Sequence, residues 1–328
     1  MNIIDKNLKK NIRLFLTGFS MGVADLIPGV SGGTIAFLSG IYEELIFSIK
    51  QVTGGTLRLI LQGKIADALK SIPFPFLIPL GVGLLTAVFT LANVLSYLLE
   101  TFPVFVWSFF FGLVLASTVI VMKRVVAWDF IDKVSFVVAA IGAYILVGLV
   151  PVETPNTLLA FFLAGAVAIC AMILPGISGS FILLLLGKYQ QILAAVTQRD
   201  VLTLAVFAAG CAVGIALFSR VLSWVFKRYH DISVAILAGF MLGSVRKIWP
   251  WKELVSTRIN SHGIEVPLVE ANVLPSVFDM SVVVAIFLAG LAVFLVYRLD
   301  KLHLVKEHTK DIKSKEFEKD HKESLKDQ

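Results

Sequence analysis

Long stretches without a charged residue dominate the chain, separated by short polar segments in which basic residues gather. Seven of these stretches contain no Asp, Glu, Lys or Arg: residues 71–99, 101–122, 134–152, 154–187, 201–219, 232–245 and 280–297. Because roughly 20 apolar residues span the bilayer core as a helix, most of them reach or approach the length of a transmembrane helix. The pattern predicts an all-α polytopic membrane protein.

Hydropathy divides the chain into eight apolar segments, of which two differ from the rest. Segments 14–49 and 158–196 are too long for one crossing, and each is broken by a run rich in proline and glycine, ADLIPGVSGGT or AMILPGISGS. We expect both to be re-entrant hairpins. The other six are expected to cross the membrane once each: residues 73–99, 103–122, 134–151, 201–226, 232–248 and 280–298. Residues 1–13 and the charged tail 299–328 lie outside these segments.

The two halves of the chain are repeats of each other. Residues 15–42 align with 162–189 at an offset of 147, with 12 identities in 28 positions. Weaker matches at offsets of 127 and 146 continue through the spans, so that repeat 1 covers 14–151 and repeat 2 covers 158–298. With re-entrant hairpins each repeat crosses three times, an odd number, and the second repeat is therefore expected to be inverted, as in many transporters.

The distribution of basic residues sets the expected orientation. With the N-terminus inside, sixteen Lys and Arg residues fall on the cytoplasmic side and six on the outer side, the bias that membrane proteins show. We expect a multi-pass protein of the plasma membrane with both termini in the cytoplasm. The net charge of +6 then reflects orientation and not a nucleic-acid partner.

The two broken runs carry the candidate chemistry. Pro28, Gly29, Pro175 and Gly176 would end one helix and start the next. Beyond them lie small and hydroxyl residues at the start of each outgoing helix, where free N–H groups attract anions. They are the candidate phosphate ligands Ser31, Gly32, Gly33, Thr34, Ser178, Gly179 and Ser180. The alternative is that these residues only allow helices to pack closely.

Few ionisable residues lie in the apolar segments. Asp25 precedes the first break and either takes part in a proton step or caps backbone N–H groups; Met172 stands at its counterpart. Arg220 either faces inward to contact an anion or extends its side chain to the cytoplasmic interface. Arg246, beside the interfacial Trp249, is a candidate for receiving a phosphate group at the outer face.

The sequence gives little support for hydrolysis, metal binding or nucleotide binding. Ser31 lies in a G-x-S-G pattern like that of intramembrane serine hydrolases, but all five histidines fall in loops or the tail, so no embedded base is available. No cluster of residues suggests a metal ion, no nucleotide-binding loop occurs, and no cofactor is expected. Cys170 and Cys211 are interpreted as small core residues.

Three motifs resemble one family closely. They are GVADLIPGVSGGT at 22–34 with GIYE at 40–43, AMILPGISGS at 171–180 with GKY at 187–189, and GSVRKIWPW at 243–251. They are similar to the polyprenyl-phosphate transporters (PopT). The resemblance implies a flippase that returns undecaprenyl phosphate to the cytoplasmic leaflet, with the isoprenoid tail in lipid and Asp25, Arg246 and the two broken runs as functional positions.

Two alternatives remain beside this transporter. A channel or exchanger for small inorganic anions would also use broken helices, and an intramembrane serine hydrolase is the third hypothesis. A groove open to lipid beside the hairpin tips would favour the transporter, whereas a closed pore would favour the channel. The expected partners are the polyprenyl phosphate and membrane lipids, and a homo-oligomer is left open.

Overall fold

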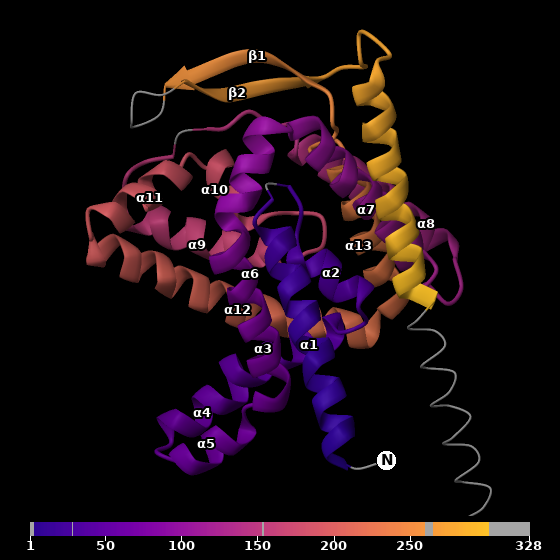
Figure 1. Cartoon of the computed structure of the whole chain (residues 1–328). Helices are drawn as coiled ribbons and strands as arrows, with labels where there is room; N and C mark the ends of the chain where they lie inside the picture. The colour runs from indigo at the N-terminus through magenta and orange to yellow at the C-terminus, as the bar shows by residue number, and fades with distance from the viewer. Residues whose placement is uncertain (1–2, 28, 153, 260–264, 302–328) are drawn as a thin grey trace, which may run out of the picture.

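A computed structural model describes residues 3–27, 29–152, 154–259 and 265–301. Within them the chain is mostly helical (Figure 1). Four helices are long and apolar enough to cross a membrane: α6 (Phe74–Thr101), α7 (Pro103–Met122), α12 (Val201–Arg228) and the C-terminal helix Met280–Lys301. Two further helices lie where the sequence predicts spans, α8 (Phe130–Leu146) and α13 (His230–Ser244), but at 17 and 15 residues both are shorter than these four.

Each of the two unusual segments consists of three helices, not two. Hairpin 1 contains α1 (Ile3–Asp25), α2 (Gly32–Leu38) and α3 (Tyr42–Lys50). Hairpin 2 contains α9 (Leu158–Ile173), α10 (Gly179–Leu185) and α11 (Tyr189–Thr197), with α10 and α11 meeting at 103°. We use these two names for the three-helix units below.

Glycines in the left-handed region explain why each hairpin breaks twice. Gly29 and Gly176 have φ of 87° and 86° at the first break, and Gly40 and Gly187 have φ of 71° and 67° at the second. Side chains other than glycine rarely adopt this conformation. Only the first break of each hairpin was expected from the sequence. The second lies at the Gly-x-Tyr pair, which also recurs at the offset of 147.

Close helix packing is also repeated in the two halves. The α1–α6 pair and the α9–α12 pair are both held by glycines, since a Cβ on any of them would overlap a carbonyl oxygen of the facing helix. Gly18 faces Leu80, Gly83 faces Phe15, Gly165 faces Phe207 and Gly210 faces Phe162. These four contacts correspond to one another at the offsets of 147 and 127 seen in the sequence.

The later helices of each half pack against helices of the other half. In the first half, α7 packs through Gly112 on Ala289 of the C-terminal helix. In the second half, α13 packs through Gly239 and Gly243 on α8. Each half therefore contributes a helix to a pair completed by the other half.

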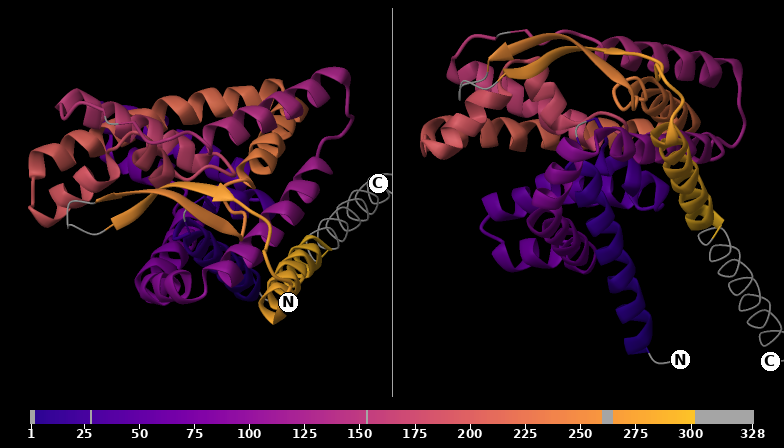
Figure 2. Two further views of the ribbon diagram at one scale, coloured as in Figure 1. Left: turned by 90° about the horizontal axis from the view of Figure 1, so that it is seen from above. Right: turned by 45° about the horizontal axis from the view of Figure 1, so that its top comes forward.

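Three short helical elements follow hairpin 1: a π-helix at Gln51–Thr56, α4 (Leu57–Leu61) and α5 (Ile65–Ser71). They lie at the same end of the molecule as the start of α1 (Figure 1). An antiparallel ribbon of β1 (Lys252–Ile259) and β2 (Glu265–Asn272) lies at the opposite end (Figures 1 and 2). No strand was expected from the sequence, and the ribbon is the one departure from an all-helical fold among the described residues.

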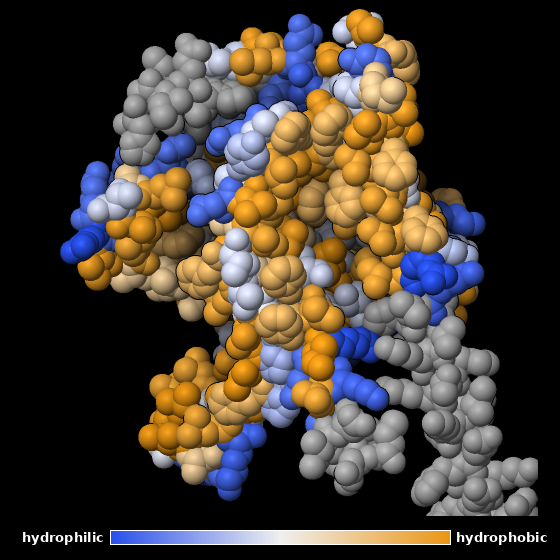
Figure 3. All heavy atoms as spheres, in the orientation of Figure 1, coloured by the Kyte–Doolittle hydropathy of each residue, from blue (hydrophilic) through white to orange (hydrophobic). Residues whose placement is uncertain are grey.

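Polar contacts show at which end of the molecule the connections between the other helices lie. At the end that holds α4 and α5, Asp231 accepts bonds from the N–H groups of Val126 and Ala127, and His230 lies 3.4 Å from Glu43. At the ribbon end, Asn272 donates to the carbonyl of Arg246. Between the two ends, the face of the molecule shown in Figure 3 is largely hydrophobic. Such a surface suits lipid and not water.

Candidate functional site

The tips of the two hairpins contact each other directly. Ser31 Oγ donates to the carbonyl oxygens of Met172 and Leu174, both at 3.2 Å. In return Thr34 Oγ1 accepts a hydrogen bond of 3.1 Å from the N–H of Gly176. Ser31 and Thr34 are 1% and 0% exposed. Two predicted phosphate ligands therefore join the hairpins in this conformation and are closed to solvent.

Side chains of hairpin 1 occupy the N–H groups at the start of α2. Asp25 accepts a 2.7 Å bond from the N–H of Gly32, and Ser31 Oγ accepts one of 3.1 Å from Gly33. A Cβ on Gly32 would lie 2.5 Å from Asp25 Oδ2. This geometry favours the capping interpretation of Asp25. Pro28, predicted to break the helix, lies outside the described residues.

Hairpin 2 lacks such a cap. Met172 takes the place of Asp25, and Ser178, the residue before α10, makes no side-chain hydrogen bond to the N–H groups of that helix. The hydroxyls of Ser178 and Ser180 instead lie 2.7 Å from each other. Pro175 and Gly176 form the break before them. The two tips are thus alike in backbone but different in polarity.

The end of α13 is packed against both tips. A Cβ on Gly29 would lie 2.9 Å from Lys247 Cγ, and one on Gly176 would lie 2.9 Å from Ser244 Oγ. Lys247 was not singled out in the sequence analysis. Its place beside Arg246 in the third motif is the sequence feature that could have identified it as a site residue.

Arg246 lines a cavity of about 370 Å³ near the ribbon. Its guanidinium donates a 3.0 Å bond to the carbonyl of Tyr144 and lies 4.5 Å from the centre of that ring. Phe111 and Trp249 form other walls. A cation beside aromatic walls suits an anionic group attached to an apolar chain.

Arg220 is placed elsewhere. Its side chain is exposed, and a Cβ on Gly54 of the π-helix would lie 3.5 Å from its guanidinium. The structure thus does not bring it together with Arg246 or with the hairpin tips among the contacts of the described residues. This position favours the interpretation that Arg220 extends to the interface.

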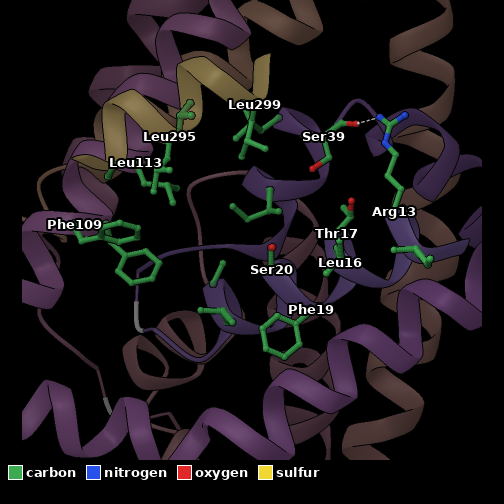
Figure 4. Close-up of a pocket in the computed structure, with 18 of the residues that line it drawn as sticks. Arg13, Leu16, Thr17, Phe19, Ser20, Ser39, Phe109, Leu113, Leu295 and Leu299 are labelled. Atoms are coloured by element: carbon green, nitrogen blue, oxygen red, sulfur yellow. Dashed lines mark hydrogen bonds between the residues drawn. The ribbon is translucent and has the colours of Figure 1, made fainter. Parts of the chain in front are cut away.

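A groove of about 670 Å³ lies beside hairpin 1 (Figure 4). Apolar side chains of α1, α2, α7 and the C-terminal helix line most of it, among them Leu16, Phe109 and Leu295. Lys9 and Arg13 line it as well, toward the start of α1. Ala24, next to Asp25, also lines it. The groove is therefore apolar along most of its wall and bears two cations.

Basic side chains hold the second turn of each hairpin. Arg13 and Arg124 donate to the carbonyls of Ser39 and Leu38 at the end of α2, where a helix carries partial negative charge. Lys188 is 0% exposed, and its three N–H groups are shared among four oxygens that lie within 3.1 Å of Nζ. They belong to Thr154, Pro155, Asn156 and Gln191. Nothing in the sequence indicated that Lys188 is buried.

Comparisons of the sequence with family models and with known proteins agree on one family. Residues 21–266 match the VCA0040-like family, described as undecaprenyl phosphate translocase-like. The chain is 44% identical over 265 residues to a polyprenyl-phosphate transporter of Vibrio cholerae, covering 81% of this chain and 86% of that protein. The chain belongs to this family. The resemblance carried by the three motifs is thereby confirmed.

A second member is more distant. A polyprenyl-phosphate transporter of Staphylococcus aureus is 32% identical over 253 residues, covering 72% of this chain and 85% of the relative. No solved structure matches the chain. Both relatives are transporters and not enzymes, which removes the hydrolase hypothesis. Ser31 agrees, because its hydroxyl is engaged with carbonyl oxygens of hairpin 2.

Proposed function

We propose that this protein carries a polyprenyl phosphate, undecaprenyl phosphate in bacteria, from the outer to the cytoplasmic leaflet of the plasma membrane. The observation that carries the proposal is the direct contact between the hairpin tips. Ser31 and Thr34 close the centre of the molecule, while the Arg246 cavity lies on the ribbon side and the apolar groove lies beside hairpin 1. A path blocked at its centre, with a cavity on each side, suits alternating access.

The two repeats are inverted in this proposal. The hairpins would enter from opposite faces, hairpin 1 from the side of α4 and α5 and hairpin 2 from the side of the ribbon. The matching glycine contacts of α1–α6 and α9–α12 support a repeat. The excess of basic residues on the α4–α5 side makes that side cytoplasmic.

The phosphate group would first meet Arg246, whose cavity lies near the outer face. Separation of the tips would then expose the hydroxyls of Ser31, Thr34, Ser178 and Ser180 and let the phosphate pass. The isoprenoid tail would stay in lipid and enter the groove along α1, where Leu16 and Leu295 offer apolar walls. Lys9 and Arg13 would attract the phosphate toward the cytoplasmic side.

Asp25 supplies a candidate for coupling to protons. Its carboxylate lies at the tip that the phosphate must pass and would repel it when ionised. Protonation from outside would remove that repulsion, and release of the proton to the cytoplasm would restore it. Hairpin 2 offers no second acid because Met172 stands at the matching position.

An anion channel is the second candidate. It would need a polar pore, whereas the groove beside hairpin 1 is lined mainly by leucine, isoleucine, valine and phenylalanine. This lining favours a ligand with a hydrocarbon tail. A groove beside a hairpin is the kind of feature that was expected to favour a lipid transporter over a channel.

Reconstitution tests the function. Purified protein in vesicles that contain labelled undecaprenyl phosphate should speed exchange of the lipid between leaflets, and Arg246→Gln should lower the rate. Lys123→Gln, an exposed cation at the opposite end, serves as the control. Conduction of chloride or phosphate without lipid exchange would contradict the transporter and support the channel.

Labelling from outside tests the orientation. In a background with Cys170→Ala and Cys211→Ala, a membrane-impermeant thiol reagent should label Ser276→Cys in intact cells and should not label Lys64→Cys. Both positions are exposed and lie at opposite ends. The reverse labelling would contradict the orientation.

A further inference from the structure

Lys247 occupies a position that no other described cation shares. Its side-chain stem lies against the tip of hairpin 1, because a Cβ on Gly29 would be 2.9 Å from Lys247 Cγ. Its ammonium lies 5.5 Å from the centre of the Phe181 ring in α10 of hairpin 2. The side chain is 25% exposed, so it is partly shielded from water but open to a ligand. Lys247 therefore contacts both hairpins at the outer side of their junction.

The ammonium of Lys247 is paired with a carboxylate from outside the helical body. Glu270 of β2 lies 3.5 Å from Lys247 Nζ and 3.2 Å from Lys252 Nζ. Lys252 in turn lies 4.6 Å from the centre of the Trp107 ring in α7. One carboxylate thus faces two ammonium groups, and the cluster of Lys247, Lys252 and Glu270 carries one net positive charge.

Glu270 stays ionised in this cluster. Burial raises the pKa of its carboxyl group, but the charges of Lys252 and Lys247 outweigh this effect and hold the pKa below its ordinary value. At neutral pH the ionised carboxylate of Glu270 is therefore paired with the ammonium of Lys247. The pair lies where a phosphate arriving from the outer face would reach the hairpins.

We propose that Lys247 binds the phosphate monoester of the transported lipid, and that Glu270 holds the same ammonium as an internal competitor until the lipid displaces it. This inference rests on the proposed function and adds Lys247, which pairs with Glu270 of the ribbon, as a second cation on the ribbon side of the molecule. A phosphate monoester carries about 1.5 to 2 negative charges at pH 7. It is therefore a stronger partner for an ammonium than a single carboxylate.

Competition and simple bracing of the ribbon predict opposite results. If Glu270 only braces the ribbon, its loss leaves lipid affinity unchanged or weakens it. If Glu270 competes, its loss frees Lys247 and strengthens binding of the lipid. The sign of the change in affinity therefore separates the two roles.

The experiment measures binding of undecaprenyl phosphate to the full chain in nanodiscs. Glu270→Gln should bind the lipid several-fold more tightly than the wild type, and Lys247→Gln about tenfold more weakly. The double variant should bind like Lys247→Gln, because Glu270 has nothing to compete for once the ammonium is gone. Glu253→Gln, on the neighbouring strand and exposed, should bind like the wild type.

Two further ligands identify the group that is recognised. Undecaprenol, which lacks the phosphate, should bind all variants equally. If Glu270→Gln tightens binding of undecaprenol as well, or leaves the affinity for undecaprenyl phosphate at or below that of the wild type, the competition is overturned. A tightened affinity for inorganic phosphate alone, without a change for the lipid, would overturn the lipid as the ligand.

Separate controls distinguish a folding defect, a failure of the proposed function and a failure of the competition. The melting temperature of each variant confirms that it is folded, and Glu270→Ala serves as a second variant that removes the competing carboxylate. A wild type that fails to bind undecaprenyl phosphate at all contradicts the proposed function. A wild type that binds it, with Glu270→Gln and Glu270→Ala unimproved, contradicts only the competition.

Discussion

The carboxylate of Asp25 accepts a 2.7 Å hydrogen bond from the N–H of Gly32 across the first break of hairpin 1. The bond ties the end of α1 to the start of α2, so the conformation of the tip depends on this acid. Gly32 leaves room for the contact, because a Cβ at that position would lie 2.5 Å from Asp25 Oδ2. The same acid is the candidate for proton coupling, and the two roles can be separated.

Asp25→Asn keeps an oxygen that can accept the Gly32 bond but removes the titrating group. We expect this variant to bind undecaprenyl phosphate like the wild type and to lose the response of lipid transport to an imposed pH gradient. Asp25→Ala removes the cap as well and should lower the free energy of unfolding by about 0.5–2 kcal/mol. Transport by Asp25→Asn that still follows the pH gradient would leave Asp25 with a structural role only.

Thr34→Val tests the contact between the hairpins. Valine has nearly the shape of threonine but cannot accept the hydrogen bond from the N–H of Gly176, which would be left buried without this partner. Such a loss costs about 1–3 kcal/mol. We expect a lower melting temperature in detergent. Thr90→Val should melt like the wild type, because Thr90 is exposed and its hydroxyl donates to the carbonyl of Thr86 within the same helix. Equal melting of the two variants would show that the bond contributes little.

Gly210→Ala tests the packing of the second half. A Cβ at this position would overlap the carbonyl oxygen of Phe162, just as one on Gly83 would overlap that of Phe15. Overpacking of this kind costs about 1–3 kcal/mol, so both alanine variants should lower the melting temperature. Gly142→Ala, where a Cβ meets no atom within 4 Å, should be neutral or slightly stabilising. A different response of Gly83→Ala and Gly210→Ala would show that the two helix pairs are not energetically equivalent.

The coarse architecture could be predicted for two reasons. Helices that cross a membrane need long apolar segments, and the two halves of the chain have similar sequences. The identities at the offset of 147 reappear as equal backbone angles at Gly29 and Gly176. The second breaks were overlooked because Gly40 and Gly187 each lie within a long segment that is apolar overall, so hydropathy gave no sign of a break there. A glycine repeated at the same offset was the available sign.

The side-chain partners could not be predicted in the same way. Sequence alone could not choose between capping and coupling for Asp25, since that choice depends on where its carboxylate lies relative to Gly32. Nor could it show that Lys247, the neighbour of Arg246 in the chain, lies against Gly29. Contacts between residues far apart in the chain depend on the packing of α13 onto the tips, which no local pattern contains.

Leu16→Trp tests the groove as the place of the isoprenoid tail. Leu16 lines the groove on α1 and is 55% exposed, so a larger ring can be accommodated there without disturbing the core, but it fills the space that the tail needs. We expect a rise of about tenfold in the dissociation constant for undecaprenyl phosphate, equivalent to about 1.4 kcal/mol, with little change for a short-chain phosphate such as geranyl phosphate. Leu8→Trp is the matched control, because Leu8 is also on α1 and 55% exposed but does not line the groove. If both variants bind the long lipid like the wild type, the tail lies elsewhere, and if both weaken binding equally, the effect belongs to the surface of α1 and not to the groove.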